Sequence, residues 1–453
     1  MQHDSKNLIL AIALSLGIMV IWQMFIAKPK IERQKQAQIE QTQKNQNGNG
    51  PAIGAPKTAG TPQAPGTLAN TGPTALMPAE LALAKTKRLK INTDKLDGTI
   101  NLTGAVFDDL RLKKYKETIK KDSPIITLLA PSGTKHGYFA EQGWQPASGQ
   151  NIKVPNSKTQ WSVVGNDTLT ADKPVTLKWD NGAGLIFTRT ISVDQNYMFS
   201  IKQEVTNNSS NAISLFPYAR VQRQEIPKLI GVFVIHEGLI GALGDDVPEL
   251  KYSDAKDGDK IEQKSKGGWV GITDKYWAVS VIPDQNAEVA GVMKHIPLGN
   301  RDAFQAHFVA EKPITIAAGA TSSFSNHLFA GAKVVDILNS YEDNLKIKKF
   351  SNLIDWGWFY FITKPMFILL HAIQSVVGNF GIAILLITLI VKAAFFPIAN
   401  KSYKSMAQMK KLQPKMAELK ERYADDRQEL QKKTMELYKQ EKVSPVAGCL
   451  PML

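Results

Sequence analysis

The residue most able to do chemistry in this chain is a lysine within an apolar segment. Lys392 follows the uncharged residues 378–391 and precedes 393–399, before a basic segment starts at Lys401. A charge at that depth costs about 2.5–3.5 kcal/mol on membrane-insertion scales, so it marks a functional site by default. Thr388 lies four residues earlier, on the same face of a helix. The pair predicts a polar groove; a lysine that snorkels to the interface is the alternative.

Patterns typical of catalytic or metal-binding sites are missing from the sequence. The seven histidines are isolated, without the spacing that metal sites need, and Cys449 is the only cysteine. There is no nucleophile elbow, phosphate loop or dinucleotide fingerprint. We therefore expect no catalytic residue, no metal and no cofactor, and we interpret the histidines as structural or surface residues. The chain is not expected to be an enzyme.

Composition indicates a mosaic of membrane and globular parts. The 453 residues are 43% apolar and carry a formal net charge of +14. Much of the basic surplus lies in residues 345–453, with 17 Lys and Arg against 8 Asp and Glu. A basic segment beside apolar spans suits the cytoplasmic side of a membrane. Nucleic acid is not an expected partner, because no nucleic-acid-binding motif accompanies the charge.

The first 80 residues predict an anchor and a tether. Residues 7–27 form an uncharged run of 21 residues, about 31 Å of helix, which is long enough to cross a bilayer. Bulky residues crowd the position where a signal peptide would be cut, so we expect an uncleaved transmembrane anchor over 1–29. Residues 30–80 are rich in Gln, Asn, Gly and Pro and predict a disordered tether.

Residues 81–345 have the pattern of a large antiparallel β-sandwich. Apolar and polar residues alternate in short runs, such as 175–180, 185–193 and 197–205, with turn residues between them. Alternation with period two is typical of strands that bury one face. We therefore expect one large β domain.

After the β domain the sequence predicts two helices in or on a membrane. Residues 346–378 are expected to form an interfacial amphipathic helix whose aromatic belt includes Trp356, Trp358 and Tyr360. Gly378 and Asn379 predict a break, and residues 379–400 are expected to cross as a second transmembrane helix carrying Lys392. Pro397 bends or ends this helix.

Residues 401–444 predict an amphipathic helical hairpin, with a merely solvated loop as the alternative. Apolar residues recur at alternating intervals of three and four, which is typical of a helix seam: Met409, Leu412, Met416, Leu419 and Tyr423. Either Asp425 or Asp426 caps the second arm, and Pro414 is expected to kink the first. Residues 445–453 would begin a third transmembrane span.

The expected topology follows from the positive charge of the predicted helical hairpin, residues 401–444. Short loops rich in Lys and Arg stay in the cytoplasm, which leaves the N-terminus cytoplasmic and the β domain outside. The residues after the first span disagree, because Lys28, Lys30, Arg33 and Lys35 taken alone favour the reverse orientation. We give the hairpin precedence.

Several segments together resemble a known family. The order and spacing of residues 355–367, 377–381, 390–397, 412–415, 441–445 and 448–451 resemble the YidC membrane-protein insertases. Residues 267–277 and 282–283 are similar to the large periplasmic domain of its Gram-negative members.

The resemblance implies a multi-pass insertase and folding chaperone of the bacterial inner membrane, acting alone or with the Sec translocon. Its implied partners are nascent membrane proteins and the lipid bilayer, and also the ribosome or targeting factors. The implied β-supersandwich is periplasmic and similar to sugar mutarotases. Lys392 matches the family's groove arginine and Thr388 a groove-lining threonine, while the hairpin matches a cytoplasmic loop that meets substrates. Lysine keeps the charge but loses the planar fork that binds carboxylates through two bonds.

Two further expectations complete the interpretation. The sequence stops where a third span would open, so we expect a truncated chain that alone would not build a closed groove or insert proteins. The alternative functions are a membrane-tethered sugar-binding or mutarotase-like enzyme, which needs converging acid and base groups, and a structural envelope anchor, which predicts that Lys392→Leu has no effect.

Overall fold

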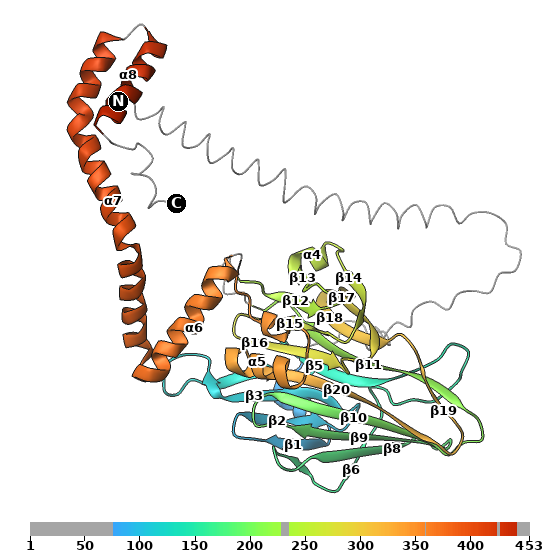
Figure 1. Ribbon diagram of the computed structural model, residues 1–453. Helices are drawn as coiled ribbons and strands as arrows, with labels where there is room; N and C mark the ends of the chain where they lie inside the picture. Colours follow the sequence, from blue (N-terminus) through green and yellow to red (C-terminus); the bar gives the residue numbers. More distant parts are fainter. Residues whose placement is uncertain (1–75, 228–234, 358, 424–425, 442–453) are drawn as a thin grey trace, which may run out of the picture. The chain divides into compact units, whose positions relative to one another are not determined.

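The computed structural model describes residues 76–227, 235–357, 359–423 and 426–441. The expected anchor, most of the expected tether and the expected third span lie outside these residues, as do Trp358 and Asp425. Within the described residues, a large β domain is followed by a series of helices (Figure 1). This agrees with the expected order of a mostly β domain and then apolar helices.

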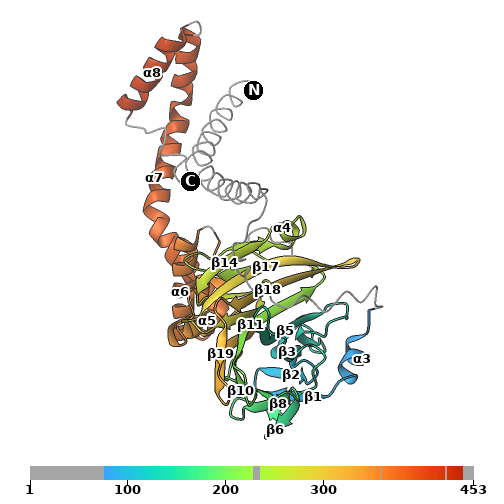
Figure 2. The ribbon, with the colours of Figure 1, turned by 90° about the vertical axis from the view of Figure 1, so that its right-hand side faces the viewer.

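Within the described residues, the first sheet has 11 strands and is antiparallel except where β1 meets β7. In spatial order it contains β14 (Ile261–Lys266), β17 (Glu288–Leu298), β18 (Arg301–Ala310), β11 (Ile213–Gln224), β5 (Tyr138–Pro146), β3 (Val106–Lys116), β2 (Leu96–Asn101), β1 (Arg88–Asn92) and β7 (Thr168–Leu169). Two further strands pair at its sides, β19 (Ile314–Ile316) with β11 and β4 (Ile125–Leu129) with β3. Figure 2 shows most of this order, from β14 to β1.

The second sheet has nine strands in the described part of the chain. Their spatial order is β13 (Glu249–Lys251), β12 (Gly238–Ala242), β15 (Trp269–Thr273), β16 (Trp277–Pro283), β20 (Thr321–Ala332), β10 (Met198–Asn207), β9 (Leu185–Val193), β8 (Val175–Asp180) and β6 (Ser162–Val164). Short helices α3 (Ala79–Ala84) and α4 (Tyr252–Lys256) accompany the sheets.

The strand pattern explains why β8 and β9 form where the sequence predicted them. Along β9 every second side chain is buried, so one face of the strand lies in the core. The turn before it is held by Asn181, whose Oδ1 accepts hydrogen bonds from the backbone N–H groups of Ala183 (2.7 Å) and Leu185 (3.0 Å). Gly182 has φ +71°, a conformation that glycine adopts without strain.

Large apolar side chains from both sheets form the core between them. Phe107 of β3 meets Phe199 of β10 edge to face, with ring centroids 5.3 Å apart. The Tyr138 hydroxyl of β5 donates across the core to the carbonyl of Ile272 in β15 at 3.1 Å. Burying each such aromatic side chain contributes roughly 1.5–3 kcal/mol, so the core holds the two sheets as one domain.

Two short helices after β20 cover the second sheet. Helix α5 (Val335–Asn344) is followed by the 3-10 helix η2 (Phe350–Leu353), in which Phe350 is completely buried. Its ring lies 5.5 Å from Trp269 and 5.4 Å from Phe329. Residues 346–354 therefore pack with the β domain rather than forming the start of an interfacial helix. The sequence pattern could not show that Phe350 is buried, because its partners Trp269 and Phe329 are distant from it along the chain.

Three long helices complete the described chain: α6 (Tyr360–Val377), α7 (Phe380–Arg422) and α8 (Arg427–Gln440). Helix α7 contains both the expected crossing segment and the first arm of the expected hairpin. Pro397 and Pro414 lie inside it and neither ends it. A proline removes one backbone hydrogen bond, and the helix continues past both positions.

Candidate functional site

The two candidate groove residues lie on one strip of α7. Lys392 and Thr388 are both exposed, and their i, i+4 spacing places them on the same side of the helix. The Thr388 hydroxyl donates to the carbonyl of Ile384 at 2.7 Å, within its own helix. The strip therefore offers a cationic group and, one turn earlier, a hydroxyl oxygen with remaining acceptor capacity.

An apolar helix surface surrounds this strip. Ala383 and Ile387 are buried on a neighbouring face, and α7 contacts α6. Other large side chains are exposed, including Leu385 at 70% and Leu389 at 64%. By length and composition, α6 and α7 could each cross a membrane. Lys392 thus lies on a helix whose surface is suited to lipid.

The position of Lys392 along α7 is measured from the corner between α6 and α7. Gly378 ends α6 with φ +72°, and Asn379 begins α7. The Asn379 Oδ1 accepts hydrogen bonds from the backbone N–H groups of Gly381 (2.8 Å) and Ile382 (3.2 Å), which is a helix N-cap. Lys392 follows 12 residues after Phe380, roughly 18 Å along the axis at 1.5 Å per residue.

The described belt residues surround the start of α6. Trp356 packs edge to face on Phe367 at 5.4 Å, and its carbonyl accepts a hydrogen bond from the Thr363 hydroxyl at 2.8 Å. Tyr360 is 64% exposed. These contacts fold the chain before α6 back onto the helix. The interfacial position of α6 stays a prediction.

The C-terminal half of α7 and α8 lie against each other as two antiparallel arms, which we call the helical hairpin (residues 401–441). Leu412 is buried at the seam, and four neighbours are half-buried: Met409, Met416, Leu419 and Tyr423. Pro414 is exposed within α7. Of the two proposed caps, Asp426 caps α8, accepting from the N–H groups of Gln428 and Glu429 at 3.0 Å each.

Two buried histidines of the β domain are held by structural contacts. His307 is buried and bonds to the Gln305 amide at 2.9 Å, and burial lowers its pKa to about 3. His327 bonds to the Ser200 hydroxyl at 3.0 Å, and burial lowers its pKa as well. Among residues 76–227, 235–357, 359–423 and 426–441, no three potential metal ligands gather together.

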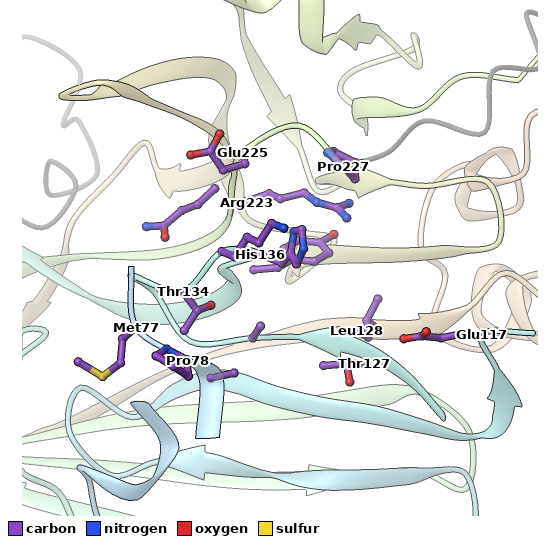
Figure 3. A pocket seen from close by; sticks show the side chains of 15 residues that line it. Met77, Pro78, Glu117, Thr127, Leu128, Thr134, His136, Arg223, Glu225 and Pro227 are labelled. Carbon is purple, nitrogen blue, oxygen red and sulfur yellow. The ribbon is translucent and has the colours of Figure 1, made fainter. Parts of the chain in front are cut away.

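The structure also contains a cavity that the sequence did not indicate. It measures about 380 Å³ and is lined by side chains from several separated elements (Figure 3), among them Met77, Pro78, Glu117, Thr134, His136, Arg223 and Glu225. The Arg223 guanidinium lies 4.7 Å from the Tyr138 ring centroid and binds Asp274 at 2.6 Å. In the described chain, His136 is exposed and has no carboxylate hydrogen-bonded to it. His136 and the carboxylates of Glu117 and Glu225 line the same cavity, and no hydrogen bond between His136 and either carboxylate is found among the described residues.

Fold and site together define a membrane protein with a large β domain, two apolar helices and a charged helical hairpin. Two family models match adjoining parts of the chain. Residues 88–369 match the YidC periplasmic domain, and residues 372–453 match the 60Kd inner membrane protein family.

Comparisons with relatives over the whole of this chain agree with the family models. The chain is 47% identical over 464 residues to the membrane protein insertase YidC of Brucella suis biovar 1 (strain 1330), covering 100% of this chain and 76% of the relative. It is 46% identical over 466 residues to the membrane protein insertase YidC of Beijerinckia indica subsp. indica, covering 100% of this chain and 75% of the relative. The chain belongs to the YidC family of membrane protein insertases, which are not enzymes, as the sequence led us to expect.

Solved structures with a similar arrangement include a putative aldose 1-epimerase from Escherichia coli K12. It has a TM-score of 0.35 and 9% identity, and the match covers 54% of this chain and 99% of that one. A galactose mutarotase-like protein from Lactobacillus casei matches with a TM-score of 0.34 and 12% identity, covering 54% and 100%.

Proposed function

We propose that this chain, as part of a full-length insertase, inserts membrane proteins into the bacterial inner membrane and assists their folding. Family membership supports the activity, and the strip of Lys392 and Thr388 on an otherwise apolar, exposed helix surface supports the site. The proposed topology is multi-pass, with a cytoplasmic N-terminus and hairpin and a periplasmic β domain, because basic loops are retained in the cytoplasm.

In this proposal the strip lowers the free energy of moving polar chain across hydrocarbon. A polar segment without hydrogen-bond partners in an apolar medium costs several kcal/mol. The Lys392 ammonium donates up to three hydrogen bonds and attracts acidic groups, and its charge keeps water near α7. Because an ammonium is a compact charge rather than a planar fork, this site acts through charge and hydration.

The helical hairpin is proposed to meet partners on the cytoplasmic side. Its surface is rich in lysine and arginine, and its two arms are joined by an ion pair between Lys415 and Glu441 at 2.7 Å. Nascent membrane proteins, the Sec translocon, and the ribosome or targeting factors are the proposed partners. The surface charge favours fast, salt-dependent encounters with acidic partners.

Replacement of Lys392 tests the proposed site. In cells depleted of their own insertase, and with this chain extended to the full length of its relatives, Lys392→Arg is expected to support growth and insertion of a small membrane protein as well as the parent sequence does. Lys392→Leu is expected to lower insertion at least about tenfold, equivalent to about 1.4 kcal/mol. Radiolabelled substrate that becomes protected from protease measures the difference.

The matched control moves the positive charge while keeping the net charge of the chain. Ile390 is exposed and lies two residues away, roughly 200° around the helix from Lys392. The double variant Lys392→Leu with Ile390→Lys keeps the lysine at a similar depth but on another face, and it should remain defective. If it functions normally, or if Lys392→Leu alone does, the strip is not the site of insertion.

A further inference from the structure

A basic, apolar-tipped turn extends from the first sheet of the β domain, between β3 and β4 (Figure 1). We call residues 113–122 the basic hairpin. They contain five lysines against one glutamate and one aspartate. All five lysines are exposed: Lys113, Lys114, Lys116, Lys120 and Lys121. Ile119, at the tip, is fully exposed.

Hydrogen bonds hold this tip in a defined turn. The backbone N–H of Glu117 donates to the Pro124 carbonyl at 3.0 Å, and that of Thr118 donates to the Ser123 hydroxyl at 2.9 Å. The N–H of Ser123 donates to the Lys120 carbonyl at 3.1 Å. Because the turn is ordered by these bonds, Ile119 is presented outward by the fold.

Aromatic side chains flank the base of the basic hairpin. The Tyr115 ring packs on Trp277 at 5.8 Å, and Trp277 packs on Tyr276 at 5.6 Å. Tyr276 is 51% exposed, and the Lys275 ammonium lies 5.0 Å from its ring centroid. Of these rings Tyr276 is exposed, and Tyr115 and Trp277 are half-buried beneath it. Tyrosine and tryptophan beside lysines are typical of surfaces at a membrane–water interface.

This surface lies at the end of the domain from which the chain leaves for the apolar helices. The N–H of Lys333, directly after β20, donates to the Tyr276 carbonyl at 2.9 Å. Burial lowers the pKa of Lys333 to about 8, while the nearby Asp355 carboxylate acts in the opposite direction. Asp355 is fixed to the domain by accepting the His236 N–H at 2.8 Å.

Only residues 356–359 separate Asp355 from the start of α6. Five extended steps span at most about 18 Å. If α6 is in or on a bilayer, that distance keeps this end of the β domain beside the lipid headgroups. The basic hairpin and its aromatic base are then within reach of the surface.

We propose that the basic hairpin, together with Tyr276, docks on an anionic phospholipid surface, with Ile119 entering the headgroup region. Charge complementarity selects the ligand, since lysines near an anionic membrane are attracted to it. The short link to α6 supplies a high local concentration of lipid, so that weak individual contacts suffice. The docking orients the β domain on the membrane, a role additional to insertion and independent of Lys392.

Fluorescence from the tip tests the proposal in the full chain. Ile119→Cys in a Cys449→Ser background provides a single attachment point for an environment-sensitive nitrobenzoxadiazole dye. The labelled protein is placed in lipid nanodiscs of phosphatidylcholine alone, or of phosphatidylcholine mixed with phosphatidylglycerol. The expected result is a blue-shifted emission in the anionic discs that weakens as salt is added, and little shift in the neutral discs.

Two controls separate docking from general effects. Val164→Cys labels an exposed apolar position on the edge strand β6, and its emission should be the same in both kinds of disc. Replacing Lys114, Lys120 and Lys121 by glutamine should abolish the emission shift of the dye at position 119. The loss of each lysine is expected to weaken the docking equilibrium about fivefold. Replacing three other exposed lysines, Lys158, Lys173 and Lys178, by glutamine removes the same charge and should leave the shift intact.

An equal shift in neutral and anionic discs, a shift that survives loss of the three lysines, or no shift in any disc would each overturn the proposal. If the triple variant loses its β-sheet circular dichroism, the single variant Lys120→Gln takes its place, because this side chain is at the exposed turn. Insertion activity is not the readout, so this result and that of the Lys392 experiment are independent.

Discussion

At the scale of single residues, Arg189 shows how the β domain joins its sheets. It extends from β9 in the second sheet, is 2% exposed, and donates to the carbonyls of Ala105 (3.0 Å) and Gln142 (2.6 Å). Its guanidinium also donates to Gln203 Oε1 at 3.2 Å and lies 5.0 Å from the Trp161 ring centroid. A buried charge is stable here because carbonyl dipoles and an aromatic face replace water.

Arg189→Ala is therefore expected to destabilise the protein by about 3–5 kcal/mol. The variant leaves a cavity and removes the donor from two buried carbonyls. Arg111→Ala is the matched control, because this arginine is 37% exposed and pairs with Asp97 at the surface; its loss should cost below about 1 kcal/mol. Denaturant unfolding of the full chain, followed by β-sheet circular dichroism, measures both. Equal losses would mean that Arg189 does not join the sheets.

At the scale of elements, the helical hairpin depends on one seam. Leu412 is 5% exposed between α7 and α8, whereas Met435 of α8 is 50% exposed. An element of two helices with a single seam has little other burial, so its local stability rests on these contacts. The seam fixes the surface that the hairpin presents to partners.

Leu412→Ala should open the hairpin more often than Met435→Ala does. Truncating a buried leucine costs about 2–5 kcal/mol, and a loss of 2 kcal/mol would raise amide hydrogen exchange in α8 about 30-fold. Met435→Ala, which removes an exposed side chain, should change the exchange little. Mass spectrometry of peptides from residues 427–440 measures the rates. Similar rates in the two variants would show that Leu412 does not hold the arms together.

The sequence predicted local elements better than the contacts between distant ones. Strands β8 and β9 coincide with the predicted runs, because alternation and the Asn181–Gly182 turn are both local signals. The burial of Phe350 was missed, because its partners Trp269 and Phe329 are far away along the chain. Lys392 and Thr388 lie on one side of α7, as helical spacing predicted, and their role as a groove stays a prediction. The 380 Å³ cavity has no sequence pattern because separate elements assemble it.

At the scale of the whole molecule, buried ionisable groups give the β domain a pH-dependent stability. The pKa of His307 is lowered to about 3, first by burial and then by the positive charges of Lys294 and Arg220. Burial lowers the pKa of His327 in the same direction. Burial raises the pKa of Asp108, despite the opposing effect of Arg88, so this carboxyl acts with the opposite sign. A variant must therefore be compared with its parent across pH.

His307 should make the domain less stable as the pH falls below about 6.5. Between that value and about 3 the unfolded imidazole is protonated and the folded one is neutral, so the unfolded state binds one more proton. This residue then removes about 1.4 kcal/mol of unfolding free energy per pH unit. His307→Gln, which keeps a hydrogen-bonding side chain, should reduce the slope by that amount between pH 6 and 4.5, or about 2 kcal/mol in all. Denaturant unfolding of the full chain at several pH values gives both slopes. Equal slopes would mean that His307 takes up a proton in the folded domain, and that burial does not keep it neutral.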